Sequence, residues 1–436
     1  MDRTGREGRA VTAPDPTLTR AAATAIAGRL ASPSQAFDAD KARVRWPQSL
    51  AHGAAGIALL HIERARTGLG RWQVAHDWLS YASRGEISAG PDSSLFYGAP
   101  AVAFALHAAA DRPGKYTRAL SVLDHHISVM TRRRLDHAHA RIDRADRPAL
   151  AEFDLIRGLT GLGAYLLQRD PHSELTRDVL SYLVRLTEPL QAEGELVPGW
   201  WTDLDPSGHP SEDFPGGHGN LGMAHGISGP LALLSLTMKR GVVVDGHTGA
   251  IRRICAWLDG WRQDHVAGPR WPEWVTRDEF RNHQSTRPGP PRPSWCYGTP
   301  GLARAQQLAG QATGDLVRQR MAEQALIGCL SERDQLAAIT DVTLCHGWSG
   351  LFRIVWRVAA DAHTPGIAAH LPRLLGKIVE QGYGDLNADR LAESMLRPLA
   401  GDLGLLEGAA GVALALHTAT AGAPPTSNWD ACLLIT

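Results

Sequence analysis

The sequence has no excess of charge of either sign, because 45 Lys and Arg residues balance 45 Asp and Glu residues among 436 positions. This balance gives no electrostatic reason to expect nucleic acid as a partner. No apolar stretch approaches the ~20 residues of a membrane-spanning helix, and the charged segment Met1–Pro16 lacks the apolar core of a signal peptide. We therefore expect a cytoplasmic protein that does not insert into a membrane.

Cysteine is scarce, and its number is odd. The five cysteines are Cys255, Cys296, Cys329, Cys345 and Cys432. An odd number in a long chain gives no disulfide framework, which fits a reducing compartment. Cys255 and Cys329 lie in apolar helical contexts and are expected to be small core residues.

Several common catalytic motifs are also missing. The sequence contains no His-Glu-x-x-His, no Cys-x-x-Cys, no phosphate-binding Gly-x-x-x-x-Gly-Lys-Ser/Thr and no strand-flanked Gly-x-Gly-x-x-Gly. Gly347-Trp348-Ser349-Gly350 is one residue short of a nucleophile elbow and has no strand before it. Ser349 is therefore interpreted as a first-turn helix residue.

What the sequence does contain is a short motif that occurs seven times. Each copy has a large polar residue, a glycine and two variable residues, and usually a small residue that opens an apolar run. The polar–glycine pairs are His52-Gly53, Tyr97-Gly98, Arg157-Gly158, His225-Gly226, Tyr297-Gly298, His346-Gly347 and Glu407-Gly408. Spacings of several tens of residues fit one helix pair per repeat with loops of variable length.

The repeats predict an all-α fold, an α/α toroid in which about seven inner helices are surrounded by about seven outer ones. Each apolar run is hydrophobic nearly all round, as a helix buried on several sides should be. A closed ring of repeats also lets a chain of this length form one domain, because each repeat buries its face against its neighbours. We expect a flexible segment at 1–17 and a single domain at 18–436, with a short insertion at about 111–150.

Two of the cysteines occupy the same position in adjacent repeats. Cys296 and Cys345 each come directly before the polar–glycine pair, and His346 follows Cys345. Two thiolates and an imidazole are ligands that suit Zn²⁺. His225 holds the polar position one repeat earlier, and Asp154 lies just ahead of the repeat before that, so these groups are expected on one sector of the rim.

Other features have plainer interpretations. His52 is expected to form a local hydrogen bond at a helix entry, and residues 62–82 are expected to be one outer helix. The His- and Arg-rich stretch 111–150 fits a solvated helical face, with zinc binding by its histidines or docking of an acidic peptide as alternatives. The long loops 196–222 and 270–294 are expected to wall a cleft, and the C-terminal tail to pack between the first and last repeats.

Three motifs in this order resemble the signature of the lanthipeptide (lantibiotic) synthetase cyclases, the LanC family. They are Ala224-His225-Gly226, Trp295-Cys296-Tyr297-Gly298 and Cys345-His346-Gly347. Asn220-Leu221-Gly222 and the Trp-Asp-x-Cys-Leu-Leu tail are similar to that family as well. The resemblance extends from about His52 to Thr436 and implies a stand-alone class I cyclase, since nothing large enough for a fused dehydratase precedes it.

The resemblance also implies a site and a reaction. One Zn²⁺ would be held by Cys296, Cys345 and His346, while His225, Asp154 and Arg292 would serve catalysis. The reaction would add peptide cysteine thiolates to dehydroalanine or dehydrobutyrine of a dehydrated precursor peptide, giving thioether rings. A dehydratase and an exporter are candidate partners, in a complex peripheral to a membrane.

Elementary chemistry assigns a role to each of these groups. A free thiol is mostly protonated at neutral pH, and a metal with an open fourth position binds it in the deprotonated form. His225 suits a general acid for the enolate, Asp154 could orient it and Arg292 could stabilise the enolate oxygen. The alternatives are another zinc-dependent thiol-adding enzyme or hydrolase on the same toroid, and a non-catalytic scaffold.

Overall fold

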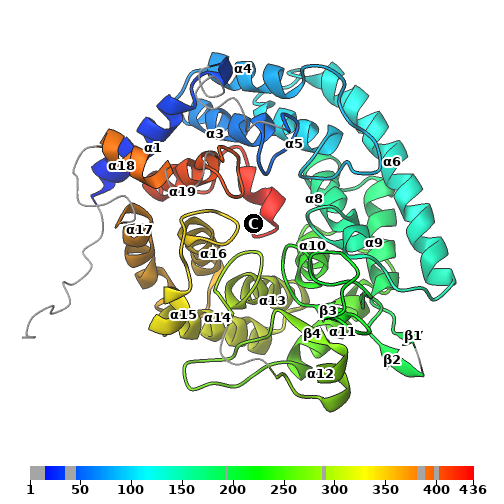
Figure 1. Cartoon of the computed structure of the whole chain (residues 1–436). Coiled ribbons are helices and arrows are strands. Elements are labelled where there is room, and N and C mark those ends of the chain that lie inside the picture. The colour runs from blue at the N-terminus through cyan, green and yellow to red at the C-terminus, as the bar shows by residue number, and fades with distance from the viewer. Residues whose placement is uncertain (1–14, 35–45, 193, 287–290, 381–387, 397–401) are drawn as a thin grey trace, which may run out of the picture.

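The computed structural model describes residues 15–34, 46–192, 194–286, 291–380, 388–396 and 402–436. Helices form two concentric rings around a common centre, as Figure 1 shows. The predicted α/α toroid is therefore confirmed. The N-terminal segment that we expected to be flexible lies almost entirely outside the described residues, and α1 already begins at Pro16.

Within the described residues the inner ring has seven helices, and each begins at one copy of the repeated motif. They are α3 (Ala54–Arg66), α5 (Ala99–Ala109), α8 (Leu159–Arg169), α10 (Ser228–Lys239), α13 (Thr299–Thr313), α16 (Trp348–Asp361) and α19 (Ala409–Ala421). Ten or more residues of α3, α5, α10, α13 and α19 are buried. Most of them are apolar, as expected for helices buried on several sides, but α3 and α13 also bury charged residues such as Glu63 and Arg304.

The second glycine of the motif allows the chain to approach itself closely at the start of an inner helix. A Cβ on Gly350 would come 2.0 Å from the Leu344 carbonyl oxygen, and one on Gly411 would come 1.9 Å from that of Leu405. Both distances are far below van der Waals contact, so only glycine fits. In the copies that carry it, the second glycine thereby fixes how the loop meets its helix.

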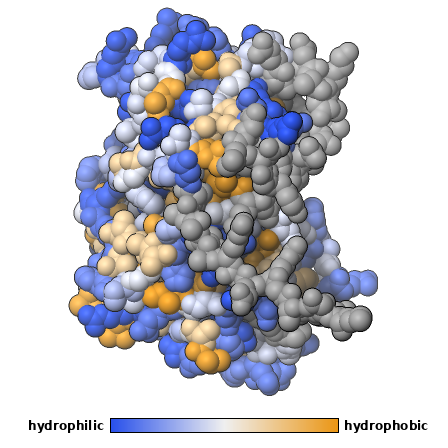
Figure 2. Space-filling view, turned by 90° about the vertical axis from the view of Figure 1, so that its left-hand side faces the viewer, coloured by the Kyte–Doolittle hydropathy of each residue, from blue (hydrophilic) through white to orange (hydrophobic). Residues whose placement is uncertain are grey.

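The outer ring surrounds these helices. It contains α1 (Pro16–Arg29), α4 (Trp72–Ala82), α6 (Thr117–Asp143), α9 (Glu174–Leu186), α11 (His247–Gly260), α14 (Leu316–Ser331), α17 (Leu371–Glu380) and α18 (Ala388–Leu396). The N-terminal α1 packs on α19 and α18, which joins the two ends of the chain and closes the ring. Figure 2 shows small apolar areas between hydrophilic residues on the side of the molecule that is on the left in Figure 1.

The prediction of one outer helix over 62–82 was wrong, because α3 continues to Arg66 and a turn containing Gly68, whose φ is +74°, separates it from α4. Residues 111–150, expected to hold an insertion, contain α6, which packs on α5, α8 and α9. The predicted division into a segment at 1–17, a domain at 18–436 and an insertion at about 111–150 stays a prediction.

The two long loops carry more structure than expected. Strand β3 (His218–Asn220) in the first loop pairs antiparallel with β4 (Trp274–Thr276) in the second. Just before the first loop, β1 (Leu190–Ala192) pairs with β2 (Glu195–Val197), which runs into that loop. Strands of three residues are too short to show an alternating pattern in the sequence. Short helices complete the fold: α7 (Leu150–Phe153), α12 (Arg277–Asn282), α15 (Arg333–Ala337), η1 (Ile367–His370) and η3 (Trp429–Leu433).

The C-terminal tail ends at the centre of the ring (Figure 1). Trp295 Nε1 donates to the Leu433 carbonyl at 3.0 Å, and Arg304 Nε donates to that of Ile435 at 2.9 Å. The expectation that the tail packs between the first and last repeats was therefore wrong in part. The tail passes α3, where Glu63 accepts hydrogen bonds from Thr426 and Ser427, but it ends against the middle of the ring.

A buried carboxylate attaches this tail to α16. Asp430 is completely buried, where it pairs with Arg353 and, at 2.8 Å, with Arg357. Burial alone would raise the pKa of Asp430, but the two guanidinium groups lower it below its ordinary value. The carboxylate thus pairs with two cations inside the ring and offsets one of their two positive charges.

We expect Asp430→Ala to lower the free energy of unfolding by about 3–5 kcal/mol, because it leaves the buried Arg353 and the partly buried Arg357 without their partner. Asp264→Ala is the matched control, since Asp264 pairs with Arg262 at the surface and should change stability by less than about 1 kcal/mol. Urea denaturation followed by circular dichroism measures both changes. Equal midpoints for the two variants would contradict this role of Asp430.

Within the described residues, no helix is long and apolar enough to cross a membrane. All five cysteines are free thiols, and Cys255 and Cys329 lie buried in the outer helices α11 and α14, as core residues do.

Candidate metal centre

The loops that lead into the inner helices are joined by backbone hydrogen bonds from one repeat to the next. Cys296 N donates to the Cys345 carbonyl at 3.2 Å, and Cys345 N donates to that of Leu406 at 2.8 Å. In the other direction Ala224 N donates to the Cys296 carbonyl at 3.3 Å, and Leu155 N to that of Ala224 at 3.1 Å. These residues occupy matching or adjacent positions of successive repeats, so the register found in the sequence becomes physical contact at the rim.

The two cysteine thiols lie in hydrogen-bond contact with each other. This bond from Cys345, together with Ser294 Oγ at 3.4 Å from the sulfur, lowers the pKa of Cys296 to about 7 although burial opposes it. The pKa of Cys345 is raised well above its ordinary value, first by the same hydrogen bond and then by burial. The pair therefore carries one negative charge readily, which is what a bound cation requires.

His346 stands beside Cys345 and is held by the loop before it. Its Nε2 lies 3.4 Å from Asp341 Oδ2, while Asp341 Oδ1 accepts hydrogen bonds from the backbone N (2.8 Å) and the hydroxyl (2.7 Å) of Thr343. A carboxylate beside one ring nitrogen is the arrangement that commonly orients metal-ligating histidines. Asp341 was not identified from the sequence, although it lies only five residues before His346.

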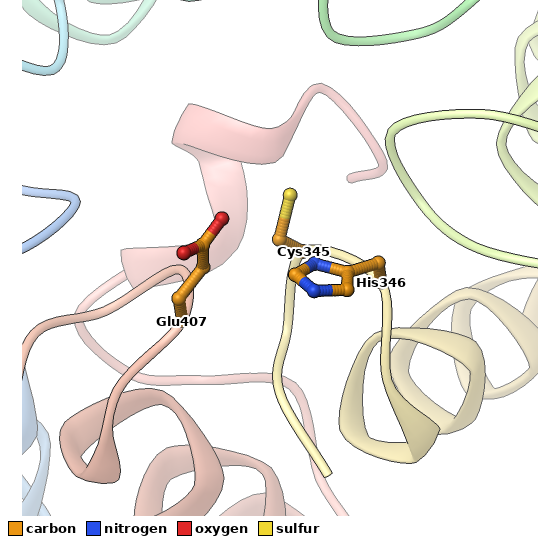
Figure 3. A group of neighbouring side chains, drawn as sticks. All are labelled: Cys345, His346 and Glu407. Carbon is orange, nitrogen blue, oxygen red and sulfur yellow. The ribbon is translucent and has the colours of Figure 1, made fainter. Parts of the chain in front are cut away.

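A carboxylate from the last repeat joins this group. Ligand atoms of Cys345, His346 and Glu407 all lie within 4.8 Å of one another, and Figure 3 shows Glu407 reaching toward the two from the neighbouring loop. We expected three protein ligands and an open fourth position, and did not identify Glu407. Its place in the repeat, equivalent to that of His346, is the signal that could have revealed it.

His225 and Asp154 form a pair on one side of this group. His225 Nδ1 lies 2.7 Å from Asp154 Oδ2, and the Asp154 side chain is completely buried. The other oxygen, Oδ1, accepts hydrogen bonds from the backbone N atoms of Arg157 (2.6 Å) and Gly158 (2.8 Å) at the start of α8. The carboxylate is therefore fixed from two sides and can hold the imidazole in one orientation.

Arg292 lies partly buried in the loop ahead of Cys296. Its positive charge contributes to the lowered pKa of Cys296, as does the nearby His225, both less than the hydrogen bonds. Its carbonyl oxygen would meet a Cβ on Gly298 at 2.6 Å, so the loop returns closely to the motif glycine. Arg292 and His225 thus lie near Cys296, whereas the group of described ligand atoms within 4.8 Å of one another that belongs to Cys345, His346 and Glu407 does not include the predicted ligand Cys296.

A second His–Asp pair lies on the other side. His52 Nδ1 is 2.5 Å from Asp402 Oδ2, across the junction of the first and last repeats. The expectation of a purely local bond for the His52 side chain was wrong, although its backbone N does bond to Ser49 Oγ at 3.2 Å. The hydrogen bond to Asp402 raises the pKa of His52 despite partial burial.

Fold and site together define a class: an α/α toroid with two cysteines, histidines and carboxylates at the rim of its ring. Residues 45–434 match the family described as lanthionine synthetase C-like protein. Because that match spans most of the sequence, the protein belongs to this family, and the resemblance noted from its motifs is confirmed.

Two relatives illustrate the family. The nisin biosynthesis protein NisC of Lactococcus lactis subsp. lactis is 24% identical over 264 residues, a match that spans 60% of this chain and 61% of the relative. A solved structure named nisin cyclase superposes with a TM-score of 0.76 at 20% identity, covering 97% of this chain and 98% of the other. The second likeness establishes the fold.

Proposed function

We propose that this protein is a zinc-dependent cyclase of lanthipeptide biosynthesis. It would add cysteine thiols of a dehydrated precursor peptide to dehydroalanine or dehydrobutyrine residues of the same peptide, forming lanthionine and methyllanthionine rings. The observation that carries the proposal is the meeting of a thiol pair, His346 and the His225–Asp154 pair at one rim. Family membership and the relative named for nisin biosynthesis support the same reaction.

The donor set fits zinc. Sulfur and imidazole are its preferred protein ligands, and the lowered pKa of Cys296 beside Cys345 makes one of the two thiols ready to lose its proton to a cation. A zinc ion held by Cys296, Cys345 and His346 would supply a Lewis acid that lowers the pKa of an incoming thiol from its ordinary value of about 8.5. Glu407 stands beside these ligands as an oxygen donor, which a softer thiolate sulfur can replace.

The remaining residues act on the peptide. Addition of sulfur to the double bond leaves an enolate, whose α-carbon must receive a proton. His225 would donate it, since the hydrogen bond between its Nδ1 and Asp154 fixes the ring and leaves the other nitrogen to face the substrate. Arg292 would stabilise the negative charge on the enolate oxygen.

A synthetic peptide with one cysteine and one dehydroalanine tests the reaction. Cyclisation leaves the peptide mass unchanged but removes one thiol that iodoacetamide can alkylate. We expect the zinc-loaded protein to protect that thiol far faster than the protein dialysed against a chelator. A mass gain of one water would indicate a hydrolase, and equal alkylation with and without protein would indicate a scaffold; either result would contradict the proposal.

A further inference from the structure

The His52–Asp402 pair repeats the chemistry of the His225–Asp154 pair on the opposite side of the candidate ligands. In both pairs the Nδ1 atom of the histidine lies within hydrogen-bond distance of an aspartate from another repeat. The repeats that carry Asp154 and His225 come before those of the cysteines in the ring. The repeats that carry Asp402 and His52 come after them, across the point where the ring closes.

Glu407 connects this second pair to the ligands. Its carboxylate lies within 4.8 Å of the ligand atoms of His52 and Asp402, and within the same distance of those of Cys345 and His346. The Glu407 side chain therefore lies beside both His52 and the candidate ligands Cys345 and His346. The His52 side chain is 47% exposed, so a molecule that binds at the rim can reach its ring.

The loop of the last repeat holds Asp402 in place. Its Oδ1 atom accepts a hydrogen bond from Gly404 N at 2.8 Å, and Gly408 passes so close that a Cβ there would lie 2.5 Å from the same oxygen. The second oxygen faces His52. With Nδ1–H of His52 donating to Asp402, the Nε2 atom is left as a proton acceptor.

We propose that His52, oriented by Asp402, is a second acid–base group of the site, which accepts the proton that the substrate cysteine gives up. This inference rests on the proposed function and deepens it. The S–H bond breaks and its proton goes to His52 Nε2, the sulfur bonds to the β-carbon of the dehydroamino acid, and His225 gives a proton to the α-carbon. Afterwards His52 releases a proton to solvent and His225 takes one up, so the sum is an isomerisation.

The electrostatic surroundings favour this direction of transfer. Asp402, which accepts the hydrogen bond, is the largest cause that raises the pKa of His52, and Glu407 adds a smaller contribution in the same sense. His52 is thus a stronger base than a free imidazole. Two separate groups would let proton removal and proton delivery occur on different sides of the reacting atoms.

The test counts protons. A synthetic peptide with one cysteine and no dehydroamino acid is titrated into the zinc-loaded protein by calorimetry at about pH 8, where an unperturbed histidine is neutral. Repeating the titration in buffers of different ionisation enthalpy gives the number of protons released. We expect the wild type and the control His76→Gln, altered on the outer face of α4, to release well under one proton, and His52→Gln to release about one.

A second variant and a rate complete the test. Asp402→Asn keeps the imidazole but removes its charged partner, and we expect a proton release between those of the wild type and His52→Gln. Single-turnover cyclisation by His52→Gln should be slower by about 10²-fold, at the low end for loss of a general base. Equal proton release by wild type and His52→Gln, with both binding the peptide, would overturn this inference alone. If the zinc-loaded wild type does not bind the thiol peptide, the proposed function fails as well.

Discussion

Cys345→Ala is expected to slow ring formation by at least about 10²-fold, because removal of a residue that only supports a metal ligand already costs about 10–100-fold. We expect this loss of rate because Cys345 interacts with the Cys296 thiol and lies next to His346. Its backbone also forms hydrogen bonds with the loops on both sides. The rate is measured as the disappearance of alkylatable thiol from the peptide that contains cysteine and dehydroalanine.

Cys329→Ala is the matched control for this experiment. It makes the same substitution in the outer helix α14, where burial raises the pKa of the thiol and keeps it protonated. We expect ring formation at the wild-type rate. Circular dichroism should show the same helical content for both variants. A wild-type rate for Cys345→Ala would rule out the assigned site.

His225→Ala is expected to slow ring formation by about 10²–10⁴-fold, the usual loss when a general acid is removed. Because His225 bonds to Asp154 and is not one of the proposed ligands, zinc content should stay at the wild-type level. The reaction in D₂O provides a second readout, since the α-carbon of each ring takes its hydrogen from the acid. His126→Ala, on the exposed face of α6, should leave the rate unchanged.

Zinc content and the rate of ring formation together separate proton delivery from a structural role. If His225 only supports the rim, His225→Ala would lose zinc together with activity. If it delivers the proton, the variant keeps its zinc and still binds the thiol peptide, but forms rings slowly. A loss of less than about tenfold, small against the usual effect of a general acid, would contradict the assignment of His225.

The fold could be predicted because its rule is local and repeated. A polar residue, a glycine and an apolar run mark the start of every inner helix, and the second glycine is required by contacts with the preceding loop. The position of each residue within its repeat then predicted that Cys296, Cys345, His346 and His225 lie on one sector of the rim. The contact of His225 with Asp154 also followed from their positions in neighbouring repeats.

What could not be predicted depends on contacts across the whole chain. His52 and Asp402 are separated by 350 residues and meet only because the ring closes. Glu407 looks like a polar helix-entry residue until the neighbouring loop brings it beside Cys345. The central position of the tail depends on Arg304 and Arg353, which look like ordinary helix residues in the sequence. The spacing of residues in the sequence does not predict such contacts, because they form only when the ring closes.

Metal analysis of the purified protein tests the central claim most directly. We expect one zinc per chain in the wild type and a loss of most of it in Cys296→Ala, with Cys255→Ala, a buried cysteine of α11, keeping the wild-type amount. X-ray absorption at the zinc edge should show two sulfur neighbours, and three after the cysteine peptide is added. Equal zinc in the wild type and Cys296→Ala, or an unchanged number of sulfur neighbours with the peptide bound, would contradict the account.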